Sequence, residues 1–243
     1  IGPETIATLQ HVARRPHGLF LVSGPTGSGK TTTLYAMLAE VDAVHRKIAT
    51  VEDPIEYRLP LLRQTQVDPS IGFTFGVGLR SLLRQDPDVL LVGEIRDQET
   101  ADMAIKASMT GHLVLSTLHT NSAIGAIPRL IDMGVEAYLV LDALIGVLSQ
   151  RLIRRLCASC RMEVEPGPEE RRWLGPEGRA WRGKGCGACE DSGYRGRTAL
   201  VELFFPEEKT LEALRSGAGV RAVEELARAG GQRSMADNGK RLV

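Results

Sequence analysis

The sequence has no excess of charge of either sign, since 30 lysines and arginines balance 30 aspartates and glutamates over 243 residues. A chain without net charge produces no overall field that would favour nucleic acid or an anionic membrane. The sequence also lacks a long hydrophobic run: its longest apolar window, about residues 138–148, contains Asp142 and is too short to span a bilayer. The chain opens at Ile1 without a methionine and without a secretory signal. We therefore expect a globular fragment without membrane insertion.

A glycine-rich segment stands between an apolar run, Gly18–Val22, and a helical pattern that begins at Thr31. The apolar run predicts a buried strand, and the spacing Gly24-x4-Gly29-Lys30-Thr31 matches a phosphate-binding loop in full. Glycines let backbone N–H groups converge on phosphate oxygens, and the N-terminus of the following helix favours the same anion. We expect Lys30 to reach the β- and γ-phosphates and the hydroxyl of Thr31 to bind Mg²⁺. An ordinary glycine-rich turn is the weaker alternative. The residues assigned to the nucleotide are Gly24, Pro25, Thr26, Gly27, Ser28, Gly29, Lys30, Thr31 and Thr32.

Two further apolar runs, Ile48–Val51 and Val89–Val92, are followed by acidic residues. Their alternation with helical periodicity predicts an α/β fold with a mainly parallel sheet, in which functional residues gather beyond the carboxyl ends of the strands. Glu94 follows the second run at the position of a Walker B acid, which polarises water or holds Mg²⁺. The acids after the first run are Glu52, Asp53 and Glu56. Solvated loop acids are the alternative at both places.

Two histidines, His112 and His119, bracket the short apolar run Leu113–Leu118. In a nucleotide-binding sheet they are candidates for sensing a γ-phosphate or for contacting a neighbouring subunit, and a structural role is the alternative. Arg96 follows Glu94 closely and could either neutralise phosphate charge or pair with a neighbouring acid.

Helical periodicity elsewhere predicts the remaining elements. Asn121–Gln150 is expected to be helical in two pieces, broken near Pro128 and Gly134, with the apolar stretch from Gly146 returning to the core as a strand or buried helix. Leu61–Gly78 is expected to form a loop and an edge strand. Further helices are expected at 4–13, 32–44, 79–84, 98–110, 211–214 and 220–229.

Four motifs occur along the chain in one order. They are Gly24–Thr31, Val51–Tyr57, Gly93–Asp97 and the pair Thr110–His112 and Ser116–Thr120, with Leu79–Asp88 leading into the third. This series resembles the secretion ATPase superfamily of type II secretion and type IV pilus systems, where the motifs are called Walker A, Asp box, Walker B and His box. The resemblance extends over roughly residues 14 to 203.

The resemblance implies a RecA-like P-loop ATPase core, working as a homo-hexamer in the cytoplasm at the inner membrane. ATP hydrolysis there would drive pilus or pseudopilus assembly, with inner-membrane platform and cytoplasmic-linker proteins as partners and no nucleic acid. Carried over, Glu56 would orient water, Glu94 would support Mg²⁺ and water, and His112 and His119 would link the γ-phosphate to neighbouring elements. The family's N-terminal domain, which supplies arginines to the nucleotide, does not precede the loop here. We therefore expect the isolated domain to bind ATP but to hydrolyse it poorly.

All four cysteines stand in two Cys-x-x-Cys pairs, Cys157 with Cys160 and Cys186 with Cys189. Paired thiolates at this spacing suit tetrahedral Zn²⁺. Two disulfides or free thiols are the alternatives, and disulfides are disfavoured in a cytosolic ATPase. We predict a structural zinc site, and divide the chain into a RecA-like core (1–153), a four-cysteine zinc-binding insertion (154–192) and a truncated C-terminal strand and helical segment (193–243).

Other functions remain as alternatives. A RecA-like helicase or DNA translocase is disfavoured because there is no basic stripe interleaved with aromatic residues. A DNA-uptake ATPase and a non-hydrolysing, nucleotide-gated scaffold share the same motifs. An arginine cluster near the cysteines is read first as a solvated face and second as a contact for an acidic membrane-protein partner: Arg151, Arg154, Arg155 and Arg161.

Overall fold

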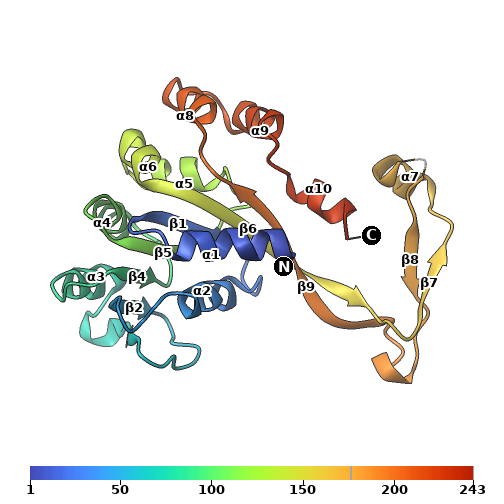
Figure 1. Cartoon of the computed structure of the whole chain (residues 1–243), viewed down its shortest axis with the longest axis horizontal. Helices are drawn as coiled ribbons and strands as arrows, with labels where there is room; N and C mark the ends of the chain where they lie inside the picture. Colours follow the sequence, from blue (N-terminus) through green and yellow to red (C-terminus); the bar gives the residue numbers. More distant parts are fainter. Residues whose placement is uncertain (176, 243) are drawn as a thin grey trace.

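The computed structural model describes residues 1–175 and 177–242. An α/β body carries a long two-stranded ribbon that reaches away from it (Figure 1). The strands of the main sheet follow the order β3-β2-β4-β5-β1-β6-β9, and all neighbours are parallel except β6 and β9. Their bounds are β1 Gly18–Ser23, β2 Ile48–Glu52, β3 Arg63–Gln66, β4 Val89–Val92, β5 Leu113–Leu118, β6 Leu144–Leu156 and β9 Tyr194–Phe204.

Helices cover both faces of the sheet, which is why the central strands are buried throughout and mostly apolar. Every residue of β1, β2, β4 and β5 is buried. Alternate side chains of a strand point to opposite faces, so Leu19 and Leu21 enter one core while Phe20 and Val22 enter the other. The second core is closed by α1 Pro3–Ala13 and α2 Lys30–Ala39. The first is closed by α3 Phe75–Leu83, α4 Gln98–Met109, α5 Ala126–Asp132 and α6 Ala137–Ala143.

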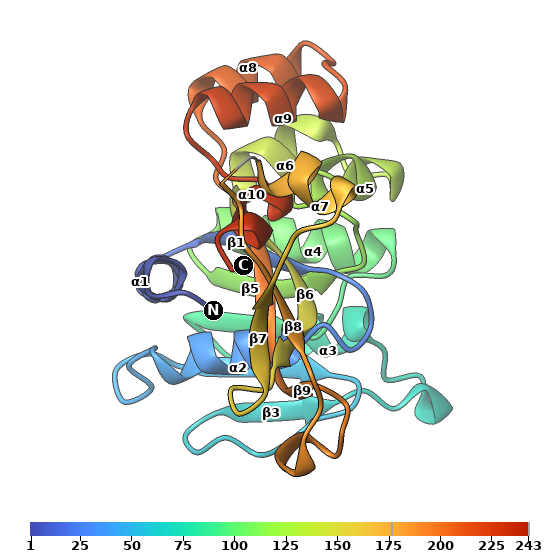
Figure 2. The ribbon, with the colours of Figure 1, turned by 90° about the vertical axis from the view of Figure 1, so that its right-hand side faces the viewer.

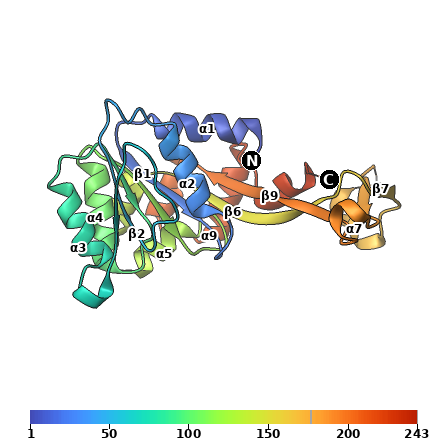
Figure 3. The same cartoon turned by 90° about the horizontal axis from the view of Figure 1, so that it is seen from below.

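The ribbon formed by β6 and β9 ends in a small module, residues 157–193, which we call the cysteine module. Figure 3 shows the ribbon leaving the body with β7 and α7 at its far end. The module contains β7 Arg161–Val164, α7 Pro168–Leu174, β8 Ala180–Gly183 and the short 3₁₀ helix η2 Gly187–Cys189, and its strands β7 and β8 form a separate antiparallel pair.

The chain ends in three helices, α8 Glu208–Arg215, α9 Val220–Ala229 and α10 Met235–Lys240. Helices α8 and α9 pack side by side beyond α6, as Figure 2 shows. Helix α10 packs on β9. Within the described ranges, none of the helices combines the length and the apolar character needed to cross a membrane.

The α/β class, the mainly parallel sheet and the edge strand β3 confirm the sequence predictions. Three boundaries were wrong. Helix α2 ends at Ala39, and α3 begins at Phe75 because the side chain of Thr74 accepts a hydrogen bond from the N–H of Val77 and so caps it. The helical stretch expected up to Gln150 ends before strand β6, which begins at Leu144 because this apolar run is enclosed between β1 and β9. Of the two forms expected for the run from Gly146, strand or buried helix, the strand is confirmed. The break at Gly134, which has a φ of +98°, is confirmed.

Candidate functional site

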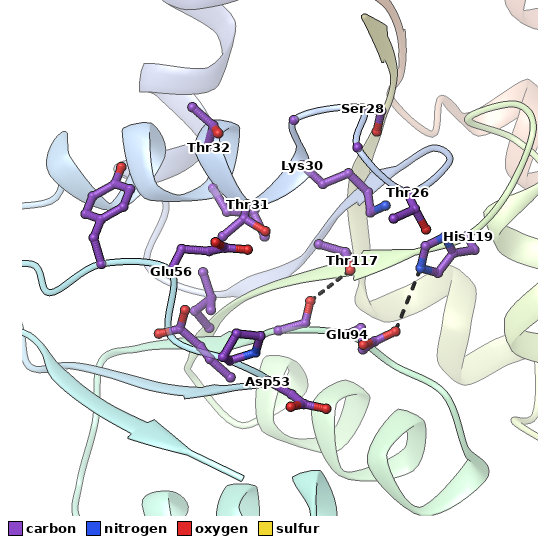
Figure 4. A pocket seen from close by; sticks show the side chains of 18 of the residues that line it. Thr26, Ser28, Lys30, Thr31, Thr32, Asp53, Glu56, Glu94, Thr117 and His119 are labelled. Carbon is purple, nitrogen blue, oxygen red and sulfur yellow. Dashed lines mark hydrogen bonds and ion pairs between the residues drawn. The ribbon is translucent and has the colours of Figure 1, made fainter.

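A cavity of about 580 Å³ opens at the carboxyl ends of β1, β2, β4 and β5 (Figure 4). It is lined by the loop and helix residues 26–32, by Glu56 after β2, by Glu94 after β4 and by His119 after β5. The carboxyl ends of parallel strands lie on one edge of a sheet, so residues far apart in sequence meet there. The structure thus brings together most of the site residues that the sequence predicts.

The phosphate-binding loop owes its shape to three glycines with positive φ: Gly24 at +141°, Gly27 at +74° and Gly29 at +87°. Helix α2 begins at Lys30, directly after Gly29, so the free N–H groups of its first turn face the cavity. The Nζ of Lys30 donates to the carbonyls of Gly24 (2.9 Å) and Pro25 (3.1 Å). Gly24 and Pro25 therefore act through Lys30, while the rest of the loop lines the cavity.

The charges around the cavity suit a phosphate–cation pair. Burial lowers the pKa of Lys30, and the nearby Glu94 carboxylate raises it in part. The hydroxyl of Thr31 and the carboxylates of Glu56 and Glu94 add oxygen ligands of the kind that Mg²⁺ prefers. These groups fit a nucleoside triphosphate with its magnesium ion by donor and acceptor chemistry alone.

Glu94 is held in place by backbone hydrogen bonds of the residues on either side of it and by the side chain of Arg96. The N–H of Gly93 donates to the carbonyl of Val51 (2.8 Å), and the N–H of Ile95 donates to that of Thr117 (3.1 Å), so the residues flanking Glu94 join β2 to β5. The guanidinium of Arg96 pairs with Oε1 of Glu94, and this hydrogen bond raises the pKa of Arg96. Of the two roles left open for Arg96, pairing with an acid is the one that the structure has.

His119 and His112 lie at opposite ends of β5. The Nε2 of His119 is 3.8 Å from Oε2 of Glu94, so this histidine belongs to the cavity. The Nδ1 of His112 contacts the carbonyl of Ala107 at 2.9 Å, beside the end of α4. A strand of this length separates its ends by about 20 Å at about 3.3 Å per residue. The structure therefore does not bring His112 to the cavity of its own chain. Its expected role, linking the γ-phosphate to neighbouring elements or contacting a neighbouring subunit, stays a prediction.

The sequence analysis named Glu52 among the acids after the first apolar run, but it did not predict the buried network that this residue forms beneath the cavity. Glu52 ends β2 at 2% exposure and accepts hydrogen bonds from Thr50 Oγ1 (2.5 Å), from Gln64 Nε2 (3.2 Å) and from the hydroxyl of Tyr35 on α2. Burial, and then the contact with Glu52, raises the pKa of Tyr35 above its ordinary range. The network joins α2, β2 and β3, and it holds the strand from which the loop of Glu56 leaves.

Arg197 on β9 also lines the cavity and was not predicted. It lies opposite Arg154 in the β6–β9 ladder, and two like charges in register repel each other. Among residues 1–175 and 177–242, Arg197 has no carboxylate within ion-pair distance. Its cation is therefore available to an anion in the cavity.

The four cysteines meet at the tip of the ribbon, with all Sγ atoms within 4.8 Å of one another. The Sγ separations are 3.9 Å for Cys157–Cys186 and 3.8 Å for both Cys160–Cys189 and Cys186–Cys189. A metal–sulfur bond of about 2.3 Å in a regular tetrahedron separates neighbouring sulfurs by about 3.8 Å. The cluster therefore has the dimensions of a four-sulfur metal site rather than of two disulfides.

The thiols of this cluster differ in acidity. Burial raises the pKa of Cys160 to about 12, and the neighbouring thiols add to the shift. Burial acts in the same direction on Cys189, but the backbone N–H groups of Cys186 and Gly193 donate to its Sγ (3.3 Å each) and its pKa falls to about 7. A thiolate is therefore stabilised at Cys189 near neutral pH, which favours a cation among the four sulfurs.

A parallel sheet with a phosphate-binding loop after β1, acids after β2 and β4 and a histidine after β5 defines a RecA-like P-loop ATPase domain. The particular family follows from comparison. The family model described as "Type II/IV secretion system protein" matches residues 1–243, and the chain belongs to this family.

Curated relatives agree. "Type II secretion system protein HxcR" of Pseudomonas aeruginosa is 50% identical over 243 residues, which is 100% of this chain and 49% of that protein. "Type II secretion system ATPase E" of Vibrio cholerae is 50% identical over 224 residues, 90% of this chain and 44% of the relative. "Type IV pilus assembly ATPase PilB" of Thermus thermophilus is 45% identical over 244 residues, 98% of this chain and 27% of the relative. The chain thus spans about half or less of the length of these relatives.

Among solved structures, "the Pilus Retraction Motor PilT and Bound ADP" is similar with a TM-score of 0.68 and 29% identity. The match covers 97% of this chain and 58% of that one. The ATPase DotB of Legionella pneumophila matches with a TM-score of 0.63 and 25% identity, over 94% of this chain and 55% of that one.

Proposed function

We propose that this chain is the motor domain of a protein that hydrolyses ATP to drive pilus or pseudopilus assembly in a type II secretion or type IV pilus system. The observation that carries the proposal is the convergence of Lys30, Glu56, Glu94 and His119 on one cavity above the phosphate-binding loop. Names of relatives support the activity, since two of them are called ATPases of secretion and pilus assembly.

Each group at the cavity has a role in this proposal. The loop N–H groups and Lys30 hold the phosphates, and Arg197 supplies a further positive charge. Thr31 and Glu94 are the residues that would hold Mg²⁺, which supplies charge neutralisation at the transferred phosphate when it is bound. Glu56 accepts the hydrogen bond that orients water, and Glu94 supports it from β4. His119 lies beside Glu94 and is placed to respond to the terminal phosphate.

The four cysteines would hold Zn²⁺ in a structural role, because four sulfur ligands leave no position for water. We propose 1–153 as the ATPase core, 154–192 as the zinc-binding insertion and 193–243 as the C-terminal part, with β6 crossing the first boundary to end at Leu156. The whole protein would form a homo-hexamer in the cytoplasm, peripherally at the inner membrane, and act with platform and linker proteins there.

Glu94→Gln tests the proposal because it keeps the shape of the side chain and removes its charge. We expect hydrolysis of MgATP to fall by about 10² or more, while MgADP binding is retained. Glu165→Gln is the matched control, since that carboxylate is 90% exposed in the cysteine module. Hydrolysis and, in cells, secretion or pilus formation are measured on the same variants. Parent-level hydrolysis in Glu94→Gln, or transport that survives without hydrolysis, would contradict the motor function.

A further inference from the structure

Gln150 is a buried polar side chain next to the phosphate-binding loop, yet it does not line the nucleotide cavity. It lies in β6 between β1 and β9, opposite Val201, and is 2% exposed. A primary amide offers two donor hydrogens and an acceptor oxygen, and burying it without partners costs free energy. The contacts that its amide makes therefore determine what it contributes.

Both ends of this amide contact the nucleotide site. The Nε2 of Gln150 donates to the carbonyl of Ser28 at 2.7 Å, in the middle of the loop. Its Oε1 accepts from the hydroxyl of Thr33 at 2.8 Å, in the first turn of α2. One side chain thus ties the loop and the helix that follows it to the same strand.

At two glycines of the loop, the close approach of Gln150 leaves no room for a side chain. A Cβ on Gly24 would lie 2.2 Å from the backbone oxygen of Gln150, and a Cβ on Gly29 would lie 2.9 Å from its Nε2. Positive φ already favours glycine at both positions. The close approach of β6 is a second, independent reason, and it shows that loop and strand fit together as one unit.

We propose that Gln150 is a positioning residue of the nucleotide site, holding the phosphate-binding loop and the first turn of α2 in the arrangement that receives the phosphates. The proposal rests on the ATP-binding function given above. Gln150 is not a catalytic residue, because its amide reaches the loop and Thr33 and leaves the cavity to other side chains. Its effect should therefore fall on nucleotide binding more than on the chemical step.

Gln150→Met keeps the length of the side chain and removes both hydrogen bonds. The loop must then be ordered at the moment of binding, which weakens ground-state and transition-state binding alike. We expect the Kd for MgADP and the KM for MgATP to rise about tenfold, with kcat within about twofold of the parent value. Calorimetric titration with MgADP and steady-state hydrolysis of MgATP give the two quantities on the full chain.

Gln150→Glu adds a pH profile that a loss of packing would not produce. Its carboxylate can accept from Thr33 but cannot donate to the carbonyl of Ser28, and it repels phosphate. Once protonated, the carboxyl O–H can donate to that carbonyl as the amide does. We expect MgADP affinity in this variant, relative to the parent at each pH, to recover about tenfold between about pH 8 and about pH 5.5.

Ser149→Ala is the matched control. Ser149 is the neighbouring buried residue of β6, its side chain points to the opposite face of the strand, and its Oγ has no hydrogen-bond partner in the described part of the chain. It should bind MgADP as the parent does. Misfolding lowers the number of sites in a titration rather than their affinity, so the affinity of the folded molecules remains readable.

The outcomes separate the two claims. A parent that binds MgADP together with Gln150→Met of unchanged Kd and KM would overturn the role of Gln150 alone. A parent chain that does not bind MgADP would overturn both the nucleotide site and the positioning role. A tenfold loss of affinity in Gln150→Met with the pH recovery in Gln150→Glu would support the inference.

Discussion

Replacing one cysteine of the cluster should separate the cysteine module from the ATPase core. Cys186→Ser removes one of four sulfurs whose Sγ atoms lie within 4.8 Å of one another. Among the described residues, none of the module's side chains between 158 and 179 belongs to either buried core of the body. The module is held instead by the β7–β8 pair, by the cluster and by Trp173, whose ring centroid lies 5.9 Å from the Nζ of Lys240 on α10.

The expected loss of stability in the module follows from its small number of apolar contacts. Four-sulfur zinc sites supply binding free energy on the order of 10 kcal/mol, as much as the whole stability of an ordinary domain. A module with so little buried apolar surface has no comparable source of stability. We therefore expect Cys186→Ser to lose bound zinc and to unfold the module, while the core keeps its sheet and its affinity for MgADP within about twofold.

Both tryptophans of the chain, Trp173 and Trp181, lie in the module, so tryptophan fluorescence reports on the module and on the contact of Trp173 with α10. The assay combines zinc content, the tryptophan emission maximum and MgADP titration. The control is Ser159→Ala, which lies inside the other knuckle, between Cys157 and Cys160, and removes no sulfur. Zinc loss with a red-shifted emission and unchanged MgADP affinity is the expected result. Full zinc content in Cys186→Ser would refute the metal site, and a tenfold loss of MgADP affinity would refute the independence of the core.

Two further predictions concern the cavity and the network beneath it. Arg197→Ala should raise the KM for MgATP about tenfold by removing a cation that lines the cavity. Arg195→Ala, two residues away on β9 and outside the cavity lining, should leave KM unchanged, and equal effects would contradict a specific role. Tyr35→Phe takes a donor from buried Glu52 and should lower the unfolding free energy by about 1–3 kcal/mol in urea titrations. Because the folded-state pKa of Tyr35 is raised, its contribution is complete below about pH 10 and is lost as the pH rises further, so the difference from Tyr35→Phe should shrink there.

Local sequence predicted the elements whose geometry is set by contiguous residues. The phosphate-binding loop needs positive φ at Gly24, Gly27 and Gly29, and these glycines appear in the sequence itself. The run from Leu144 to Gln150 does not determine its own secondary structure, because a short apolar stretch suits a buried strand and a buried helix equally well. The run forms a strand because it pairs with β1 and β9. Strand β9 lies some fifty residues further along the chain, so the local sequence pattern does not predict this pairing.

The site residues likewise divide into those that local sequence predicts and those whose positions depend on distant strand pairing. His112 and His119 look equivalent in sequence, but the direction of β5 places only His119, which follows the strand, beside Glu94. This difference could have been inferred from the sequence, because the ligand of a parallel sheet binds at the carboxyl ends of the strands. The roles of Gln150 and Arg197 could not have been predicted from the sequence, since glutamine and arginine within strands belong to no phosphate-binding pattern. Their positions depend on the β6–β9 register, which pairs Gln150 with Val201 and Arg154 with Arg197. Because β6 continues from Gln150 to the residue before Cys157, the strand that supports the phosphate-binding loop is also the strand that begins the cysteine cluster. A substitution that shifts this register would displace both sites together, whereas a change within either site need not reach the other.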